Sequence, residues 1–317
     1  MEARPPFISR WWLLLVLAVV PDSRALDRVV QQSYPVGAGC ALRLDSYRGS
    51  VEVKPIAVAE IRIAVNLQVF IDDDREADRL LGRLQLEMKQ DYNTVTVIAR
   101  NPSETRFRFA WQEKQQIKIS YTVSVPAGCT VDIATADGDI VVGDLTGPVR
   151  AHTHRGAISI RHVYGDIAAT TDSGDIIGSH CAAAATLKTL HGMIRVGTIE
   201  GAADFHTVNG DIEVQHALGG INAFAEEGHI TAGFGKAFGP AAKFATDGGD
   251  ITLYLDPAVH CTLAASSVWG HVHTNLPFAV QSGGDGRKSL AGQLNGGGSL
   301  LTVHADGGQV RIIPPKN

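Results

Sequence analysis

Glycines recur every 18 residues through the middle of the chain. The surrounding residues repeat as well, in the form T-x-x-G-D-I-x-V, with looser copies around Gly249, Gly270 and Gly308. Small residues also fall midway between the early glycines, so each unit divides into two halves. A short fixed period is typical of stacked equal units and excludes most globular folds. The strictly spaced glycines are Gly138, Gly156, Gly174, Gly192, Gly210 and Gly228.

Residues that share a position in every unit are expected to lie in one column. Isoleucine stands two positions after each of these glycines, as in Ile140, Ile158 and Ile176, and apolar and polar residues alternate around it. Alternation predicts strands with one buried face, which each unit can bury only against its neighbours. We therefore predict an all-β, right-handed, single-stranded parallel β-solenoid, β-helix-like, with rungs of about 18 residues. An antiparallel sandwich is the alternative.

The ends of the chain depart from this period. Residues 26–128 are expected to form a first rung and a small strand–helix–strand excursion, the α/β part, which caps the first exposed sheet edge. Regular repeats then occupy 129–280. The glycine-rich stretch 281–298 is expected to be a loop, and 299–317 a last rung with a C-terminal tail.

The N-terminal segment 1–25 predicts export. Arg4 and Arg10 come before a short apolar run, Trp11 to Val20. Small residues then stand before an expected cleavage point at Leu26, as in secretory signal peptides. Such a run is too short to span a bilayer, so we expect no transmembrane span in the mature chain. The expected location is the periplasm, the outer membrane surface or the medium. The net charge of −5 and the lack of a basic stripe argue against a nucleic-acid partner.

The repeated unit resembles the adhesin-like β-strand-repeat family, a group of domains of unknown function common in bacterial envelope proteins. The resemblance includes the P-x-G-C-x-V lead-in at 126–131 and the closing GGGSLLTVHADGGQVRI at 296–312, and it extends over 38–313. It implies a β-helix-like solenoid at the cell envelope and carries no catalytic residue.

Cysteines form one candidate site. Cys40, Cys129 and Cys261 each lie half a period before a repeat glycine, whereas Cys181 is out of register. If their rungs stack side by side, Cys40 and Cys129 are a candidate disulfide, which export would favour. Buried free thiols are the alternative.

Histidines form a second candidate site, because all twelve follow position 150. In the later copies of the repeat, the residue directly after the repeat glycine is alternately an aspartate and a histidine. His273 lies on the same face of its strand as His271, the last residue of this column. These residues are candidate ligands of a divalent metal ion, with a solvated outer face as the alternative. The ligands would be His229, Asp250, His271 and His273, preceded in the column by Asp211.

Carboxylates form a third candidate site. Asp139, Asp175 and Asp211 each follow a repeat glycine two rungs apart, roughly 10 Å, just beyond the separation of an inverting glycosidase pair. Gly-Asp is also an ordinary turn dipeptide.

Phe107, Phe109 and Trp111 are a candidate recognition patch or the cover of a core edge.

The sequence as a whole favours a non-enzymatic exported scaffold or adhesin-like binding module, whose partner is an unknown envelope protein or glycan. The motifs of common hydrolases, metalloproteases and nucleotide-binding proteins are missing, and no cofactor is expected. The alternatives are a glycan-active β-helix enzyme that uses the three aspartates, and a metal-binding His/Asp ladder.

Overall fold

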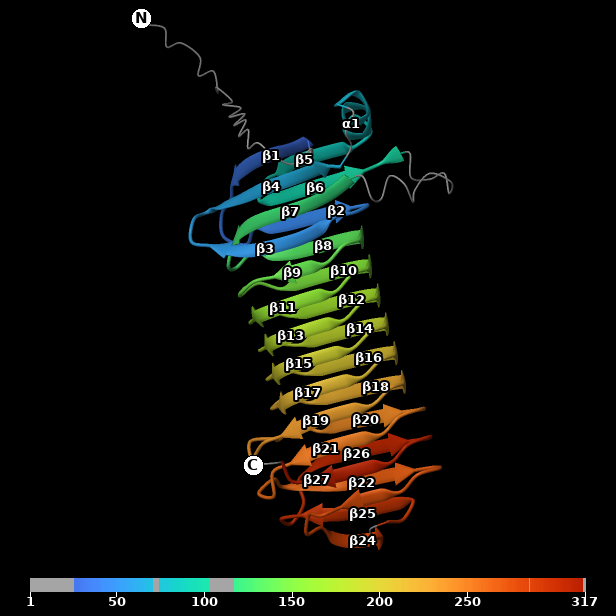
Figure 1. The fold of residues 1–317 in the computed structure, drawn as a ribbon. Helices are drawn as coiled ribbons and strands as arrows, with labels where there is room; N and C mark the ends of the chain where they lie inside the picture. The colour runs from blue at the N-terminus through green and yellow to red at the C-terminus, as the bar shows by residue number, and fades with distance from the viewer. Residues whose placement is uncertain (1–25, 71–73, 103–116, 285, 316–317) are drawn as a thin grey trace, which may run out of the picture.

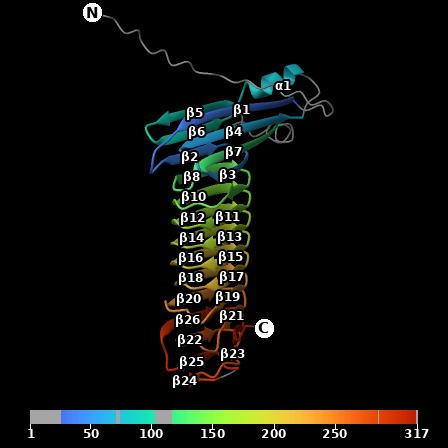
Figure 2. The ribbon, with the colours of Figure 1, turned by 90° about the vertical axis from the view of Figure 1, so that its left-hand side faces the viewer.

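The protein is an elongated column built from two β-sheets (Figure 1). The computed structural model describes residues 26–70, 74–102, 117–284 and 286–315. Within these ranges the sheets contain 13 and 14 strands, and they run side by side along the column (Figure 2). One α-helix, α1 (Asp74–Leu81), is found in the described part of the chain, and no helix there is long and apolar enough to cross a membrane.

Each regular rung supplies one strand to each sheet. The strands of the first sheet are β8 (Thr130–Asp137), β10 (Val149–Arg155), β12 (Ile167–Ser173), β14 (Ala185–His191), β16 (Ala203–Asn209), β18 (Ile221–Glu227) and β20 (Ala242–Thr246). Those of the second are β9 (Ile140–Val142), β11 (Ile158–Val163), β13 (Ile176–Cys181), β15 (Ile194–Ile199), β17 (Ile212–Ala217), β19 (Ile230–Phe234) and β21 (Ile251–Leu255).

The register between rungs equals the period of the sequence. Ile158 pairs with Ile140 on one side and with Ile176 on the other, in parallel strands. These isoleucines are fully buried between the two sheets, where the large side chains of Phe205 and Phe244 also lie. The predicted all-β solenoid is therefore confirmed, with two strands in each rung.

The repeat glycines form the turn between the two strands of a rung. Gly174 has φ of 150°, and a Cβ built on it would lie 2.1 Å from the carbonyl oxygen of Gly156 in the rung before. Only glycine combines that conformation with that contact. A buried threonine closes most of these turns, since Thr171 Oγ1 donates to the same Gly156 oxygen at 3.0 Å, although Ala225 takes the threonine position beside Gly210. The same bond joins Thr153 to Gly138, Thr189 to Gly174 and Thr207 to Gly192.

Further strands extend both sheets at the N-terminal end, and the outermost of them pair antiparallel. One sheet is extended beyond β3 (Ser50–Ile56) by β7 (Ile117–Pro126), β4 (Glu60–Val69) and β1 (Leu26–Pro35). The other is extended beyond β2 (Ala41–Ser46) by the hairpin of β6 (Thr94–Arg100) and β5 (Gln85–Asp91). The first parallel rung thus has no open edge.

The C-terminal rung lies inside the stack. β26 (Ser299–Ala305) pairs with β20 on one side and with β22 (Cys261–Ser267) on the other. In the second sheet, β27 (Val310–Ile313) lies between β21 and β23 (Val272–Thr274). The last segment of the chain therefore separates two rungs that are consecutive in the sequence.

The glycine-rich stretch 281–298, expected to be a loop, contributes strands instead. β24 (Ala279–Gly283) and β25 (Ser289–Leu294) form an antiparallel hairpin that pairs with β22. Leu290 and Leu294 are buried, because apolar residues alternate along β25 and give it a core-facing side. This hairpin covers the C-terminal end of its sheet.

Candidate functional site

The carboxylates after the repeat glycines bind backbone of the next rung. Asp139 Oδ1 accepts the N–H of Ala157 at 2.8 Å, and Asp175 Oδ1 accepts that of Met193 at 2.8 Å. Asp211 Oδ1 accepts the N–H of His229 at 2.7 Å. A rung with a different side chain thus lies between successive aspartates, and each carboxylate satisfies an exposed turn amide. The geometry gives these three aspartates a structural task and does not pair them for glycan cleavage.

The acid–imidazole ladder expected at the later rungs is interrupted. Asp250 and His271 were expected to be neighbours, but Gln309 of the inserted rung lies between them and donates its N–H to Asp250 Oδ1 at 2.8 Å. His229 Nδ1 accepts the N–H of Asp250 at 3.0 Å, and His273 pairs in register with Arg311. Within the described ranges, no three His, Cys, Asp or Glu side chains are grouped closely enough to hold a metal ion. The expected contact between Asp250 and His271 is therefore wrong.

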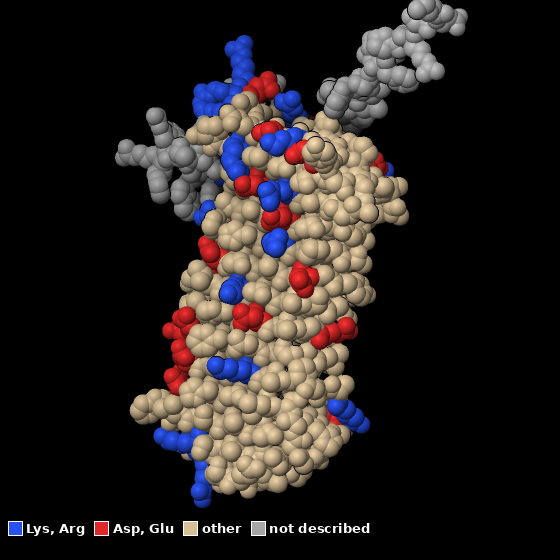
Figure 3. Space-filling model, turned by 180° about the vertical axis from the view of Figure 1, so that it is seen from behind, with Lys and Arg blue, Asp and Glu red and all other residues tan. Residues whose placement is uncertain are grey.

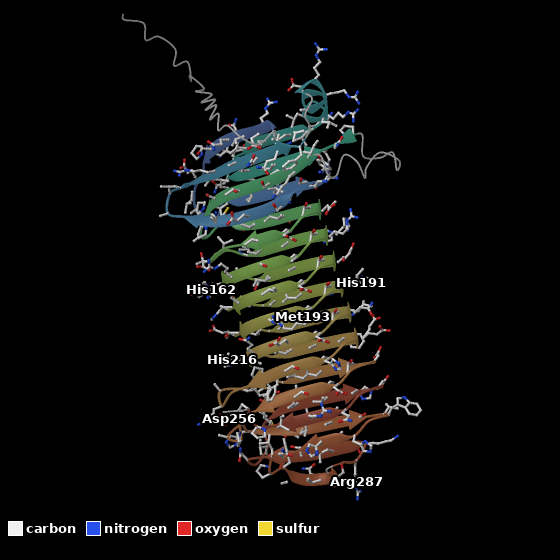
Figure 4. All side chains as sticks on the ribbon, viewed as in Figure 1. His162, His191, Met193, His216, Asp256 and Arg287 are labelled. Atoms are coloured by element: carbon white, nitrogen blue, oxygen red, sulfur yellow. The ribbon has the colours of Figure 1, made fainter. Side chains whose placement is uncertain are left out.

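An imidazole column does run along one corner of the stack. His162 and His180 are register partners with ring centroids 6.0 Å apart, and His216 follows beyond Thr198. His162 Nδ1 lies 2.9 Å from Asp144 Oδ1. Hydrogen bonds from the ring and the backbone N–H of His162 hold the pKa of Asp144 below its usual value. Figure 4 shows His162 and His216 on the same lateral edge of the column.

The four cysteines are buried free thiols. β2 and β8 pair so that Ala41 faces Thr130, which brings Cys40 beside Cys129 as the sequence predicted. The structure keeps the two as thiols where the sequence offered a disulfide, and burial raises the pKa of the Cys129 thiol.

Two other expected features, the export segment 1–25 and the aromatic patch of Phe107, Phe109 and Trp111, lie outside the described residues.

Among the concave regions on the described residues, two lie on the sides of the column. The larger, about 740 Å³, runs beneath the N-terminal cap along the turns at Gly49, Gly138 and Gly156. Its lining mixes apolar Phe70, Ile117 and Ile119 with Arg48, Lys118 and the ion pair of Arg155 with Asp137. Charged side chains gather around this capped end, and broad uncharged areas lie farther down (Figure 3).

The smaller region, which we call the lateral hollow, has a volume of about 470 Å³ and lies on the outer face of β17, β19 and β21. Glu213, Gln215 and His216 of β17 line one side, and Tyr254 and Asp256 line the other. Figure 4 shows His216 and Asp256 on one edge of the column. This hollow was not expected from the sequence, although it lies where the spacing of the repeat glycines lengthens, between Gly228 and Gly249.

Comparison with protein families identifies the fold. The model of the family described as Toastrack DUF4097 matches residues 78–312, about three quarters of the chain. The chain belongs to the Toastrack family. The match begins within α1 and ends in β27, so the Toastrack unit includes every regular rung and the inserted C-terminal one. No curated protein matches the sequence.

Solved structures similar to this Toastrack protein carry provisional names. A protein from Bacteroides fragilis, named as an adhesin, is 12% identical, with 90% of this chain and 97% of that one covered and a TM-score of 0.42. A lipid binding protein by name, from Parabacteroides distasonis, is 9% identical over 89% and 96%, with a TM-score of 0.38. One from Clostridium sporogenes, named for cell adhesion, is 8% identical over 91% and 100%, with a TM-score of 0.21.

Proposed function

We propose that this Toastrack protein is an exported, non-enzymatic binding module of the bacterial cell envelope, with an envelope protein or glycan as its partner. The observation that carries this proposal is the use of Asp139, Asp175 and Asp211 as backbone acceptors. Carboxylates held in this way are poorly placed to act as a general acid and base on one substrate.

The strands that border the repeats support the same function. β4, β1 and β5 pair antiparallel at the N-terminal end, and the β24–β25 hairpin borders one sheet at the other end. A strand that joined the column there would meet one of these bordering strands and not a regular rung. The long lateral faces are then the surfaces that the regular rungs offer for recognition.

Export is tested by expressing the full-length chain in a Gram-negative host and measuring the intact mass of the protein released from the periplasm. The tripartite pattern of residues 1–25 predicts a mature protein that begins at Leu26. A cytoplasmic protein that retains Met1 would contradict an envelope role.

Binding and catalysis are separated by one assay on insoluble envelope polysaccharide and on envelope vesicles. We expect the wild type and a D139N/D175N/D211N variant to be retained equally, with no release of reducing ends by either. Reducing ends released by the wild type and not by the variant would establish the glycan-active alternative. Retention on neither material would contradict a binding role.

A further inference from the structure

The regular pairing of the stack is interrupted at the lateral hollow. Val214 pairs with Ala232 and Ala217 with Phe234, so Gln215 and His216 of β17 face Gly233 alone on β19. Two residues opposite one make a β-bulge, which bends the strand and redirects its side chains. Every other pairing between consecutive rungs from β9 to β19 keeps a constant register in the described residues. The bulge is therefore a local feature of this surface.

Glycine at position 233 makes room for the hollow. A Cβ there would lie 2.3 Å from the carbonyl oxygen of Gln215, so the bulged strand approaches closely only because that atom is missing. Tyr254 is the register partner of Gly233 on the next strand and lines the hollow. With no side chain on Gly233, the tyrosine ring has no side-chain neighbour in its own column on that side. Gly235 at the rim is open, since a Cβ added there would meet no heavy atom within 4 Å.

The polar side chains of the hollow fall into two groups, those that are hydrogen-bonded within the protein and those that are not. In the first group, Glu213 accepts the Nε–H of Arg195 at 2.8 Å, and Asp256 accepts the N–H of Ala258 at 2.9 Å. The side chains of Gln215, His216 and Tyr254 make no hydrogen bond to any residue that the structure describes. An amide, an imidazole and a phenol that face one hollow provide both donors and acceptors for a polyhydroxylated ligand.

We propose that the lateral hollow binds a pyranose unit of a neutral glycan, with one sugar face on the Tyr254 ring and sugar hydroxyls hydrogen-bonded to Gln215 and His216. The volume of about 470 Å³ lies in the range of small-molecule sites, which combine an aromatic surface with a few polar groups. A tyrosine ring offers an apolar face and a polar tip, as the two sides of a sugar ring require.

Charge selects the kind of glycan. Glu213 and Asp256 place two carboxylates in the lining, and of these Glu213 is paired with Arg195 outside it. The negative charge that remains disfavours uronic acids, sulfated sugars and phosphorylated sugars. This inference rests on the proposed binding function and names the ligand class for one part of the lateral surface.

The test is calorimetric titration of the mature protein with four probes: maltotetraose, cellotetraose, N-acetylchitotetraose and tetragalacturonate. We expect saturable binding of at least one neutral probe, and no binding of the anionic one. Tyr254→Ala should weaken that binding at least tenfold, and Gln215→Ala should weaken it severalfold. Tyr164→Ala is the matched control, because Tyr164 is an exposed tyrosine outside the hollow and its loss should leave affinity unchanged.

Three results would overturn the proposal: no saturation by any neutral probe, unchanged affinity in a folded Tyr254→Ala protein, or preference for tetragalacturonate. Circular dichroism of each variant verifies that the rungs are folded. If envelope material still retains Tyr254→Ala as well as the wild type, the assignment to the hollow fails while the proposed binding function stands. If the wild type itself is not retained, the binding function fails independently of this site.

Discussion

At the scale of single residues, a column of glycines and a column of threonines determine the turn in most rungs. The glycines accept close contact with the carbonyl of the rung before, and the buried threonines donate to that carbonyl. Each column solves a different problem, since the glycine avoids a steric clash and the threonine satisfies a part-buried carbonyl oxygen.

Gly210→Ala should destabilise the fold by at least about 2 kcal/mol. Gly210 has φ of 155°, and an added Cβ would lie 2.0 Å from the Gly192 oxygen. Urea unfolding followed by circular dichroism measures the loss. Gly235→Ala is the control and should be nearly neutral, because its Cβ meets no atom within 4 Å. Equal stability of the two variants would contradict the steric account.

Thr189→Val should cost about 1 kcal/mol, because the shape is kept and the hydrogen bond to Gly174 O is lost. The same unfolding experiment applies. Thr186 lies on the same strand and is exposed, so Thr186→Val should change stability little. A threonine column that merely fills space would show no difference between the two.

The buried thiols should react slowly in the native protein. Burial raises the pKa of Cys181 and of Cys261 to about 11, so the thiolate fraction at pH 8 is on the order of 10⁻³. Titration with Ellman's reagent should give little colour before guanidinium is added and four thiols afterwards. Two thiols after unfolding would establish the Cys40–Cys129 disulfide that the sequence alone leaves open.

At the scale of elements, hydrogen-bonded His–Asp pairs join neighbouring rungs. His154 Nδ1 lies 2.8 Å from Asp172 Oδ2, and His162 Nδ1 lies 2.9 Å from Asp144 Oδ1, in each case one full period away along the sequence. These side chains are exposed, so each pair contributes little to the free energy of unfolding.

Stability should fall in acid partly through Asp144. Its folded pKa is lowered by His162, so its contribution is present above the unfolded pKa of about 4 and is lost as pH falls through the folded value. The difference in unfolding free energy between wild type and Asp144→Asn should therefore shrink as the pH falls from 5 to 2. A difference that stays constant over this range would refute the assignment. His162→Gln, which removes the partner, should show the same trend.

At the scale of the whole molecule, the inserted rung joins the repeats to the C-terminal end. β26 and β27 each pair on both sides, with β20 and β22 in one sheet and with β21 and β23 in the other. Their removal would leave unpaired the strand edges of β20 and β21 with which they now pair, and it would separate the β22–β25 region from the stack.

Deletion of residues 299–317 should lower the unfolding midpoint and cause self-association, measured by scanning calorimetry and by light scattering after gel filtration. Deletion of 314–317 is the control, since β27 ends at Ile313 and remains paired. A monomer of unchanged stability after the longer deletion would show that the rung is dispensable.

The sequence by itself determined the solenoid and the buried isoleucine column, because at a constant period the distance along the chain fixes the neighbour in space. Where the period ends, that relation fails. The tertiary structure alone decided that 299–313 separates Asp250 from His271, that the glycine-rich stretch forms β24 and β25, and that Gln215 and His216 bulge over Gly233. These pairings depend on how a strand returns to a distant edge and on local packing there, which no repeat encodes.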